Sequence, residues 1–437
     1  MNTSDLLIRN GATLKLLFIA VLSLAMLIPL FMVRSIIEER QGLKQSAEQT
    51  IANRWGGGQT VSGLVAVTKT PVTETTANGM KMRHEWLANV LAELTISASL
   101  VTEWRYLGIY QVPVYSTVVK INGRIDWEKL NSLQADDELI FWLPLGDVRG
   151  VREISPLTLG SLKLSAKPLG VAANNNTGLQ FTLSPEDRSR AIESKDDQYH
   201  LELKLAGSHS LLFLPLADTT QVTLEADWPH PEFIGQFLPG ERTITAEGTT
   251  ANWQTLGLNR PFGDQWPMAE LASNQLNMAG FGLRLETPVD GYQRSERSVK
   301  YGFLFISLTF FTLFLFEVMT GRPLHPVPYV LTGAALAVFY LVLLALSEFL
   351  PFMGAFAAAA LSLVLIVTAY TGVVLGRRRR GYLVGAMMGL TYSLLFVLVS
   401  AEHASLLIGS LALLMAITTL MYLTRKVDWY AYGRGKV

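Results

Sequence analysis

The chain has 437 residues, with 36 Lys and Arg, 36 Asp and Glu, no cysteine and a mean hydropathy of +0.29. Half of its residues are hydrophobic and 16% are charged, whereas soluble domains carry roughly 25% charged residues. This composition excludes a disordered chain, a disulfide-stapled secreted domain and a thiolate metal site. The zero net charge is the sum of an acidic central segment and basic flanking segments. Residues 34–301 hold 25 basic and 31 acidic residues, and the rest of the chain holds 11 basic and 5 acidic residues.

Six apolar stretches are each long enough to cross a bilayer as a helix, which takes about 20 residues. The stretches are Leu16–Val33, Gly302–Met319, Pro328–Ser347, Phe352–Leu375, Tyr382–Ser400 and Ala404–Leu423. The one charged residue within them is Glu317, near the end of the second stretch. The sequence therefore predicts a membrane protein with one span, then a large polar segment, then five spans.

The first stretch has two interpretations. Arg9 and Lys15 precede it as in a cleaved signal peptide. Its apolar run is longer than an ordinary signal sequence, however, and no small-x-small cleavage site follows before Arg34. An uncleaved anchor is the favoured interpretation.

Lys and Arg in short loops predict the orientation. With a cytoplasmic N-terminus, the inside segments contain Arg9, Lys15, Arg322, Arg377 to Arg380, Arg425, Lys426, Arg434 and Lys436, and the two short outside loops contain none. Basic residues that flank the long segment weigh little in this rule. We therefore expect both termini in the cytoplasm and the large domain in the periplasm. The expected segments are 1–33, 34–301, 302–423 and 424–437.

The polar segment is expected to be all-β and sandwich-like, as one sandwich or two halves. Leu201–Leu205, Val222–Ala226 and Phe281–Leu285 alternate apolar with polar or small residues, which is typical of strands with one buried face. Asn122-Gly123 predicts a tight hairpin turn between Val118–Ile121 and Arg124–Trp127. Gly170–Lys195 is the expected loop or boundary between halves, and the stretch from Arg34 to about Ile51 is expected to continue the first span as a helix.

Catalytic signatures are absent from the sequence, including the phosphate loop, the His-Glu-x-x-His metal motif, the Gly-x-Ser-x-Gly elbow and the Rossmann glycines. The histidines are scattered, and the acidic polar segment disfavours nucleic acid. We expect no enzyme, no cofactor, no metal and no nucleic-acid partner.

Two constellations of the polar segment are candidate sites. Prolines hold the loop Trp228-Pro229-His230-Pro231, followed by Phe233, in an extended form that presents His230. It is either a recognition loop or a packed aromatic loop. Asp147 and Arg149 stand between Gly146 and Gly150 and form either a structural turn with an ion pair or a ligand contact.

Ionisable residues at the membrane edges form a third candidate set: Glu317, Arg425, Glu348, Glu402 and His403. Glu317 is expected near Arg322, His325 and Arg425 on the inner side. Glu348, Glu402 and His403 are expected near Arg297 and Lys300 on the outer side. These groups either line a path or lock the bundle by interfacial ion pairs, and the second interpretation is favoured.

Several short elements resemble the bacterial inner membrane protein CreD family. Asp227–Phe233 with Gln236–Pro239 is similar to its "NWPHPSF…DFLP" segment, and Gly146–Gly150 matches its GD-x-RG element. Further similar elements are Lys300-Tyr301 with Phe316-Glu317, Leu324–Pro326, Phe339-Tyr340, Leu343–Glu348, and Leu423–Arg425 with Asp428–Tyr430. The part before residue 140 matches loosely, and Gly170–Lys195 looks unrelated. The resemblance implies a Gram-negative inner-membrane protein tied to envelope integrity and stress responses, and it implies no catalytic residues.

Three functions remain as hypotheses. The leading one is a non-catalytic envelope-integrity protein whose periplasmic β domain contacts an unknown envelope protein, lipid or cell-wall component. The second is a transporter or lipid-handling protein that uses the five clustered spans. The third is a periplasmic enzyme centred on His230 and Asp147.

Overall fold

The computed structural model describes residues 11–76, 79–132, 139–170, 177–195, 197–268, 276, 278–287, 291–320, 324–401 and 405–425. The chain divides into two compact units. The helical unit comprises residues 1–44 and 289–437, and the β unit comprises residues 45–288.

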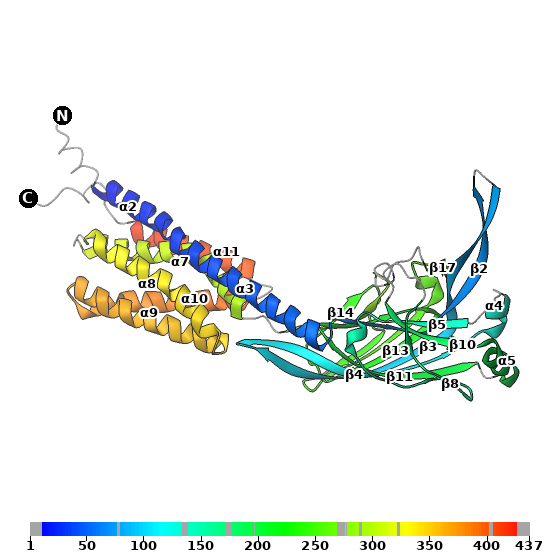
Figure 1. Ribbon diagram of the computed structural model, residues 1–437. Coiled ribbons are helices and arrows are strands. Elements are labelled where there is room, and N and C mark those ends of the chain that lie inside the picture. The colour runs from blue at the N-terminus through cyan, green and yellow to red at the C-terminus, as the bar shows by residue number, and fades with distance from the viewer. Residues whose placement is uncertain are drawn as a thin grey trace, which may run out of the picture. The chain divides into compact units, whose positions relative to one another are not determined.

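The helical unit contains α2 (Gly11–Ala25), the first part of α3 (Leu27–Trp55), α7 (Gly291–Thr320), α8 (Pro326–Ser347), α9 (Phe352–Val374), α10 (Arg378–Ser400) and α11 (Ser405–Thr424). Among the described residues, five helices are long and apolar enough to cross a membrane, and α11 contributes a shorter apolar stretch. Helices α7 to α10 lie side by side as a bundle (Figure 1). The prediction of six candidate spans in a one-plus-five arrangement is confirmed.

Helix α3 continues beyond the apolar stretch, as the sequence predicted, and ends at Trp55. Its later part is polar, and its surroundings therefore differ from those of the spans. Ile51 and Trp55 pack against Val112 and Val114 of the β unit. The end of the helix is thus part of the β unit's own packing.

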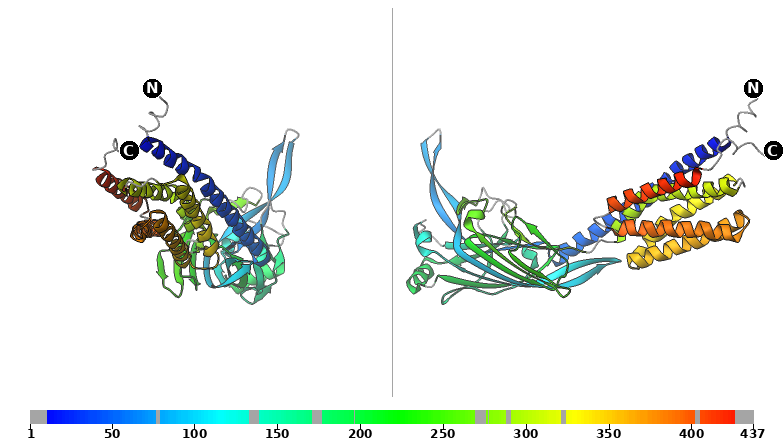
Figure 2. Two further views of the ribbon diagram at one scale, coloured as in Figure 1. Left: turned by 90° about the vertical axis from the view of Figure 1, so that its left-hand side faces the viewer. Right: turned by 180° about the vertical axis from the view of Figure 1, so that it is seen from behind.

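The β unit is built from two sheets (Figure 2). The smaller one has the order β1-β12-β18-β14 and contains β1 (Gln59–Ser62), β12 (Ser210–Leu214), β18 (Phe281–Leu285) and β14 (Pro231–Gly235). The larger one has fourteen strands, and its main path runs β8-β7-β11-β4-β3-β2-β5-β10-β9.

The strands of the larger sheet are β2 (Val65–Thr76), β3 (Gly79–Leu107), β4 (Tyr110–Arg124), β5 (Leu139–Pro144), β6 (Val151–Ile154), β7 (Leu157–Leu159), β8 (Leu162–Leu164), β9 (Lys167–Pro168), β10 (Gly178–Leu183), β11 (Gln198–Ser208), β13 (Ala217–Ala226), β15 (Glu241–Ile244), β16 (Thr249–Leu256) and β17 (Gln265–Pro267). Short helices lie at α4 (Trp127–Ser132), α5 (Pro185–Ser194), η1 (Val148–Gly150) and η2 (Gly257–Asn259). The long strand β3 pairs with β2 and β17 along its first part, and with β4 and β13 along its second part.

One hydrophobic core joins the two sheets. Phe213 and Phe281 from the smaller sheet pack with Ile96, Leu203 and Trp253 from the larger sheet, and all are buried. The alternating stretches Leu201–Leu205, Val222–Ala226 and Phe281–Leu285 lie in β11, β13 and β18. The predicted all-β, sandwich-like domain between the first span and the others is confirmed.

The predicted Asn122-Gly123 hairpin is wrong. Strand β4 runs straight through both residues, which pair with Thr95 and Leu94 of β3 on one side and with His200 and Tyr199 of β11 on the other. The φ of Gly123 is not positive, so the residue does not adopt a turn conformation. The glycine is needed for close packing, because a Cβ there would lie 2.4 Å from the Glu93 carbonyl oxygen and from the Tyr199 ring.

The predicted boundary at Gly170–Lys195 is also wrong, and residues 171–176 lie outside the described part. Strand β10 pairs with β5 along its whole length, and Phe181 is buried in the common core. Helix α5 follows at once, with Ser184 as its N-cap accepting from the Asp187 N–H. This stretch belongs to the single β unit because its apolar residues complete that unit's core.

Candidate functional site

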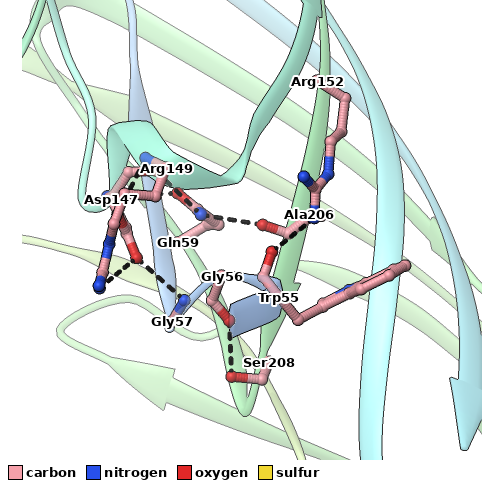
Figure 3. A network of polar contacts seen from close by, with 9 residues as sticks. All are labelled: Trp55, Gly56, Gly57, Gln59, Asp147, Arg149, Arg152, Ala206 and Ser208. Atoms are coloured by element: carbon pink, nitrogen blue, oxygen red, sulfur yellow. Dashed lines mark hydrogen bonds and ion pairs between the residues drawn. The ribbon is translucent and has the colours of Figure 1, made fainter. Parts of the chain in front are cut away.

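A polar network joins the end of α3 to the β sheets (Figure 3). The guanidinium of Arg152 donates to the Trp55 carbonyl oxygen at 2.9 Å, which places a cation at the negative end of the helix dipole. Gly56 follows with φ +140°, and its carbonyl accepts from the Ser208 hydroxyl at 2.9 Å. A side chain at Gly56 would also meet the Ala206 carbonyl oxygen at 2.4 Å, so this turn requires glycine.

Asp147 and Arg149 lie beside this helix end, in the turn η1. The Asp147 carboxylate accepts from the Arg149 guanidinium at 2.9 Å at both oxygens, and from the Arg149 N–H at 3.0 Å. It also accepts, at 3.1 Å, from the N–H of Gly57, two residues after the end of α3. The side-chain amide of Gln59 ties the same turn to β11 by donating to the carbonyls of Asp147 and Ala206. The arrangement fixes the connection from α3 to β1.

The charge of Asp147 is favoured by its surroundings. Partial burial opposes ionisation, but the hydrogen bonds from Arg149 and Gly57 outweigh it and hold the pKa of the Asp147 carboxyl below its usual value. A lowered folded-state pKa stabilises the fold at pH values above the ordinary carboxyl pKa. That contribution is lost as the pH falls through the lowered value.

We expect Asp147→Ala to lower the free energy of unfolding by about 1–3 kcal/mol, because the Gly57 N–H loses a charged acceptor. Asp147→Asn should cost less, about 1 kcal/mol, because it removes mainly the half-exposed ion pair with Arg149. Denaturation of the detergent-solubilised full chain, followed by tryptophan fluorescence, measures both effects. The difference between wild type and Asp147→Asn should shrink as the pH falls from about 4, where the carboxyl of the unfolded chain becomes protonated, through the lowered pKa of the folded state. A pH-independent difference would contradict the role given to this charge.

The loop Trp228-Pro229-His230-Pro231 is fastened by its tryptophan. Trp228 is buried, and its indole N–H donates to the carbonyls of His230 at 2.9 Å and Glu286 at 3.2 Å. Its ring lies 5.7 Å from the ring of Trp104. Phe233, in β14, meets the ring of Trp253 edge-on. His230 is exposed, so the structure separates a packed half of the loop from an exposed half.

Glu317 lies within the helical unit and is completely buried. Its carboxylate pairs with the ammonium of Lys15 from α2 and accepts from the Tyr329 hydroxyl of α8 at 2.9 Å. Lys15 also donates to the Leu324 carbonyl at 2.7 Å. The sequence had suggested Arg322, His325 and Arg425 as neighbours. Arg322 lies outside the described residues, His325 caps α8 by accepting from the Val327 N–H, and Arg425 stacks on Tyr422 at 3.9 Å.

Glu348, at the opposite end of α8 from Tyr329, lies 3.5 Å from the Arg40 guanidinium of α3 and accepts from the Tyr292 hydroxyl at 3.2 Å. Lys300, one of its expected neighbours, pairs instead with Glu296. Glu402 and His403 lie outside the described residues. Glu317 and Glu348 are the two membrane-edge carboxylates that the structure describes. Each of them pairs with a cation near the N-terminal end of the chain, Lys15 of α2 or Arg40 of α3.

His230 and Asp147 were the candidate residues of an enzyme. The carboxylate oxygens of Asp147 are occupied by Arg149 and Gly57, and His230 lies in the separate Trp228 loop. Within the described ranges, no group of three or more His, Cys, Asp or Glu side chains could hold a metal ion.

Sequence reasoning missed the partners that complete these sites: Lys15, Tyr329, Arg40, Gly57, Gln59 and Ser208. The sequence indicates Lys15 only as a basic residue that precedes the first span and bears on its orientation or cleavage. One signal was available, because the run Gly56-Gly57-Gly58 follows directly on a polar helix. Such a run is typical of a helix end held close to other backbone.

Comparison with known proteins gives one consistent result. The family model described as "Inner membrane protein CreD" matches residues 11–430. The chain belongs to the CreD family. It is 30% identical over 428 residues to the inner membrane protein CreD of Escherichia coli strain K12, and the match covers 95% of this chain and 93% of that protein.

Membership of the CreD family and the apolar helices together make this a multi-pass protein of the inner membrane. Its spans contact the lipid bilayer, and large apolar side chains such as Leu331, Leu361 and Leu390 face outward from α8, α9 and α10. The CreD resemblance stated from short motifs is confirmed over nearly the whole chain.

Proposed function

We propose that this CreD family protein supports envelope integrity as a non-catalytic inner-membrane protein, and that its β unit lies in the periplasm. The observation that carries the proposal is the insertion of a folded β unit, residues 45–288, between candidate spans of an inner-membrane family. Open sheet edges do not occur in the lipid interior, because their backbone N–H and C=O groups would lack hydrogen-bond partners there. The β unit therefore lies in water, on one side of the membrane.

The distribution of Lys and Arg supports the periplasmic side for this unit and the cytoplasm for both termini. The segments proposed are 1–33 for the cytoplasmic N-terminus and first span, 34–301 for the periplasmic segment, 302–423 for the five-helix bundle and 424–437 for the cytoplasmic tail. The chain contains no cysteine, so single introduced cysteines test this orientation cleanly.

Leu258→Cys in the β unit should react with a membrane-impermeant maleimide in intact spheroplasts, because Leu258 is almost fully exposed. Arg377→Cys, between α9 and α10, should react only after lysis. Labelling in the reverse order would contradict the orientation.

The partner is proposed to be another envelope component (a protein, a lipid or a cell-wall component), recognised by the exposed half of the Trp228 loop. The loop residues are Trp228, Pro229, His230, Pro231 and Phe233, with His230 presented to solvent and Trp228 holding the loop in place. Deletion of the gene should increase sensitivity to detergent and to cell-wall antibiotics. The wild-type gene should restore resistance, His230→Ala should restore it poorly, and the exposed control Leu258→Ala should restore it fully. Unchanged sensitivity on deletion would overturn the proposal.

A lipid-handling function is the second candidate, and an apolar groove of about 240 Å³ between α7, α10 and α11 favours it. Phe305, Phe311, Leu398 and Leu413 are among the side chains that line the groove, with Ser307 as a polar group. Filling it with Ser307→Trp should abolish function without loss of thermal stability if lipid enters there. Replacing Glu348, Glu402 and His403 together is the companion test of a path through the bundle.

A further inference from the structure

The end of β3 and the start of β4 project beyond the sheet as a two-stranded hairpin. In the described part of the sheet, β13 pairs with β3 only as far as Leu100, and β11 pairs with β4 only as far as Val114. Beyond these points the two strands pair with each other alone, from Trp104 opposite Pro113 to Leu107 opposite Tyr110. At about 3.4 Å per residue this free ribbon is roughly 14 Å long.

The tip of this hairpin is apolar and aromatic. Trp104 is 44% exposed, Tyr106 64%, Leu107 38% and Ile109 43%. Arg105 stands among them, paired with the Glu103 carboxylate at 2.8 Å. A free two-stranded ribbon is only marginally stable in water, and exposing clustered apolar side chains marks a contact surface. Tryptophan, tyrosine and arginine next to aliphatic residues form the composition that prefers the boundary between lipid headgroups and acyl chains.

The base of the hairpin is held on both sides. On one side, the Asp227 carboxylate accepts from the Thr102 N–H at 2.8 Å, and the buried Trp228 packs its ring against Trp104. On the other side, the ring of Trp55 lies under the Arg105 guanidinium at 4.2 Å. The hairpin is therefore presented as a rigid element, and its apolar tip is not free to fold back onto the core.

The hairpin also lies along the helix by which the chain enters the β unit. The Trp55 indole donates to the Tyr115 carbonyl, and Ile51, one turn earlier, packs against Val112 and Val114. Going back along α3 thus means going along β4 toward the tip. Since α3 continues the first candidate span, the hairpin lies beside the segment by which the chain enters the β unit.

We propose that the tip of the β3–β4 hairpin, residues 104–109, inserts Tyr106, Leu107 and Ile109 into the headgroup region of the bilayer that anchors the chain. The hairpin thereby forms a second contact with lipid, which holds the β unit at the membrane surface. This contact goes beyond the proposed envelope function and does not rest on it, because it holds for whichever leaflet faces the β unit.

The test uses the full chain in phosphatidylethanolamine–phosphatidylglycerol vesicles. Leu107→Cys and Ile109→Cys are labelled singly with bimane, and quenching is measured with phospholipids that carry a nitroxide near the headgroup. Leu258→Cys is the matched control. Leu258 is an exposed apolar residue next to Leu256, which pairs with Thr219 at the end of β13 opposite to the hairpin. The two tip labels should be quenched several-fold more strongly than the control.

Equal quenching at the tip and at Leu258 would overturn the proposal. Tip labels shielded both from the lipid nitroxide and from a water-soluble quencher would also overturn it, because protein, such as a second copy of the chain, would then cover the tip. A circular dichroism melt identical to wild type for each cysteine variant establishes that the labels report on the folded protein.

Discussion

Lys15→Met is expected to destabilise the helical unit by about 3–5 kcal/mol, because it removes the Lys15 ammonium that pairs with the buried Glu317 carboxylate. Glu317→Met should cost a similar amount, because the Lys15 ammonium would lose its counter-charge and, among the described residues, keep only the Leu324 carbonyl as a hydrogen-bond acceptor. The double variant Lys15→Met/Glu317→Met should recover most of the loss, since replacing both members of a buried pair with apolar residues is often nearly neutral. Thermal unfolding of the four proteins in detergent forms a double-mutant cycle that measures the coupling.

The chain offers a matched control for this pair. Arg40 and Glu348 lie 3.5 Å apart, but the Arg40 side chain is 41% exposed. Arg40→Met should therefore cost no more than about 1 kcal/mol, as is usual for exposed ion pairs. Equal losses for Lys15→Met and Arg40→Met would contradict the view that Glu317 and Lys15 lock α2 to α7 through a buried pair.

Gly123→Ala is expected to destabilise the β unit strongly, by about 3 kcal/mol or more. The added Cβ would lie 2.4 Å from the Glu93 carbonyl oxygen and from the Tyr199 ring, and the carbonyl is backbone that cannot swing away. Chemical denaturation of the full chain, followed by tryptophan fluorescence, measures this loss.

Gly240→Ala is the control for Gly123→Ala, because a Cβ there has nothing within 4 Å. It should change the free energy of unfolding by less than about 1 kcal/mol. This change also measures how much an alanine stabilises the protein by lowering the conformational entropy of the unfolded chain. A cost for Gly123→Ala as small as that for Gly240→Ala would mean that Tyr199 does not pack over this glycine.

The spans could be read from the sequence because their surroundings are simple. A helix in lipid must be apolar around its whole circumference and long enough to cross, whatever its neighbours are. The same holds for strands with one buried face: the alternation in Val222–Ala226 and Leu201–Leu205 follows from the two faces of a strand. These local periodicities determined the fold class and the number of candidate spans.

The tertiary structure decided what local patterns leave open. Asn-Gly favours a hairpin turn by its own conformational freedom, yet Tyr199, far along the chain, covers Gly123 and makes it a strand residue. Lys15 and Glu317 are 302 residues apart, and Gly57 and Asp147 are 90 apart, so their pairing follows from packing and leaves no short-range signal. Composition and periodicity determined which surfaces are buried, because hydrophobic burial is local and non-directional. Only the folded chain determined which polar groups meet, because hydrogen bonds and ion pairs require particular atoms at particular distances.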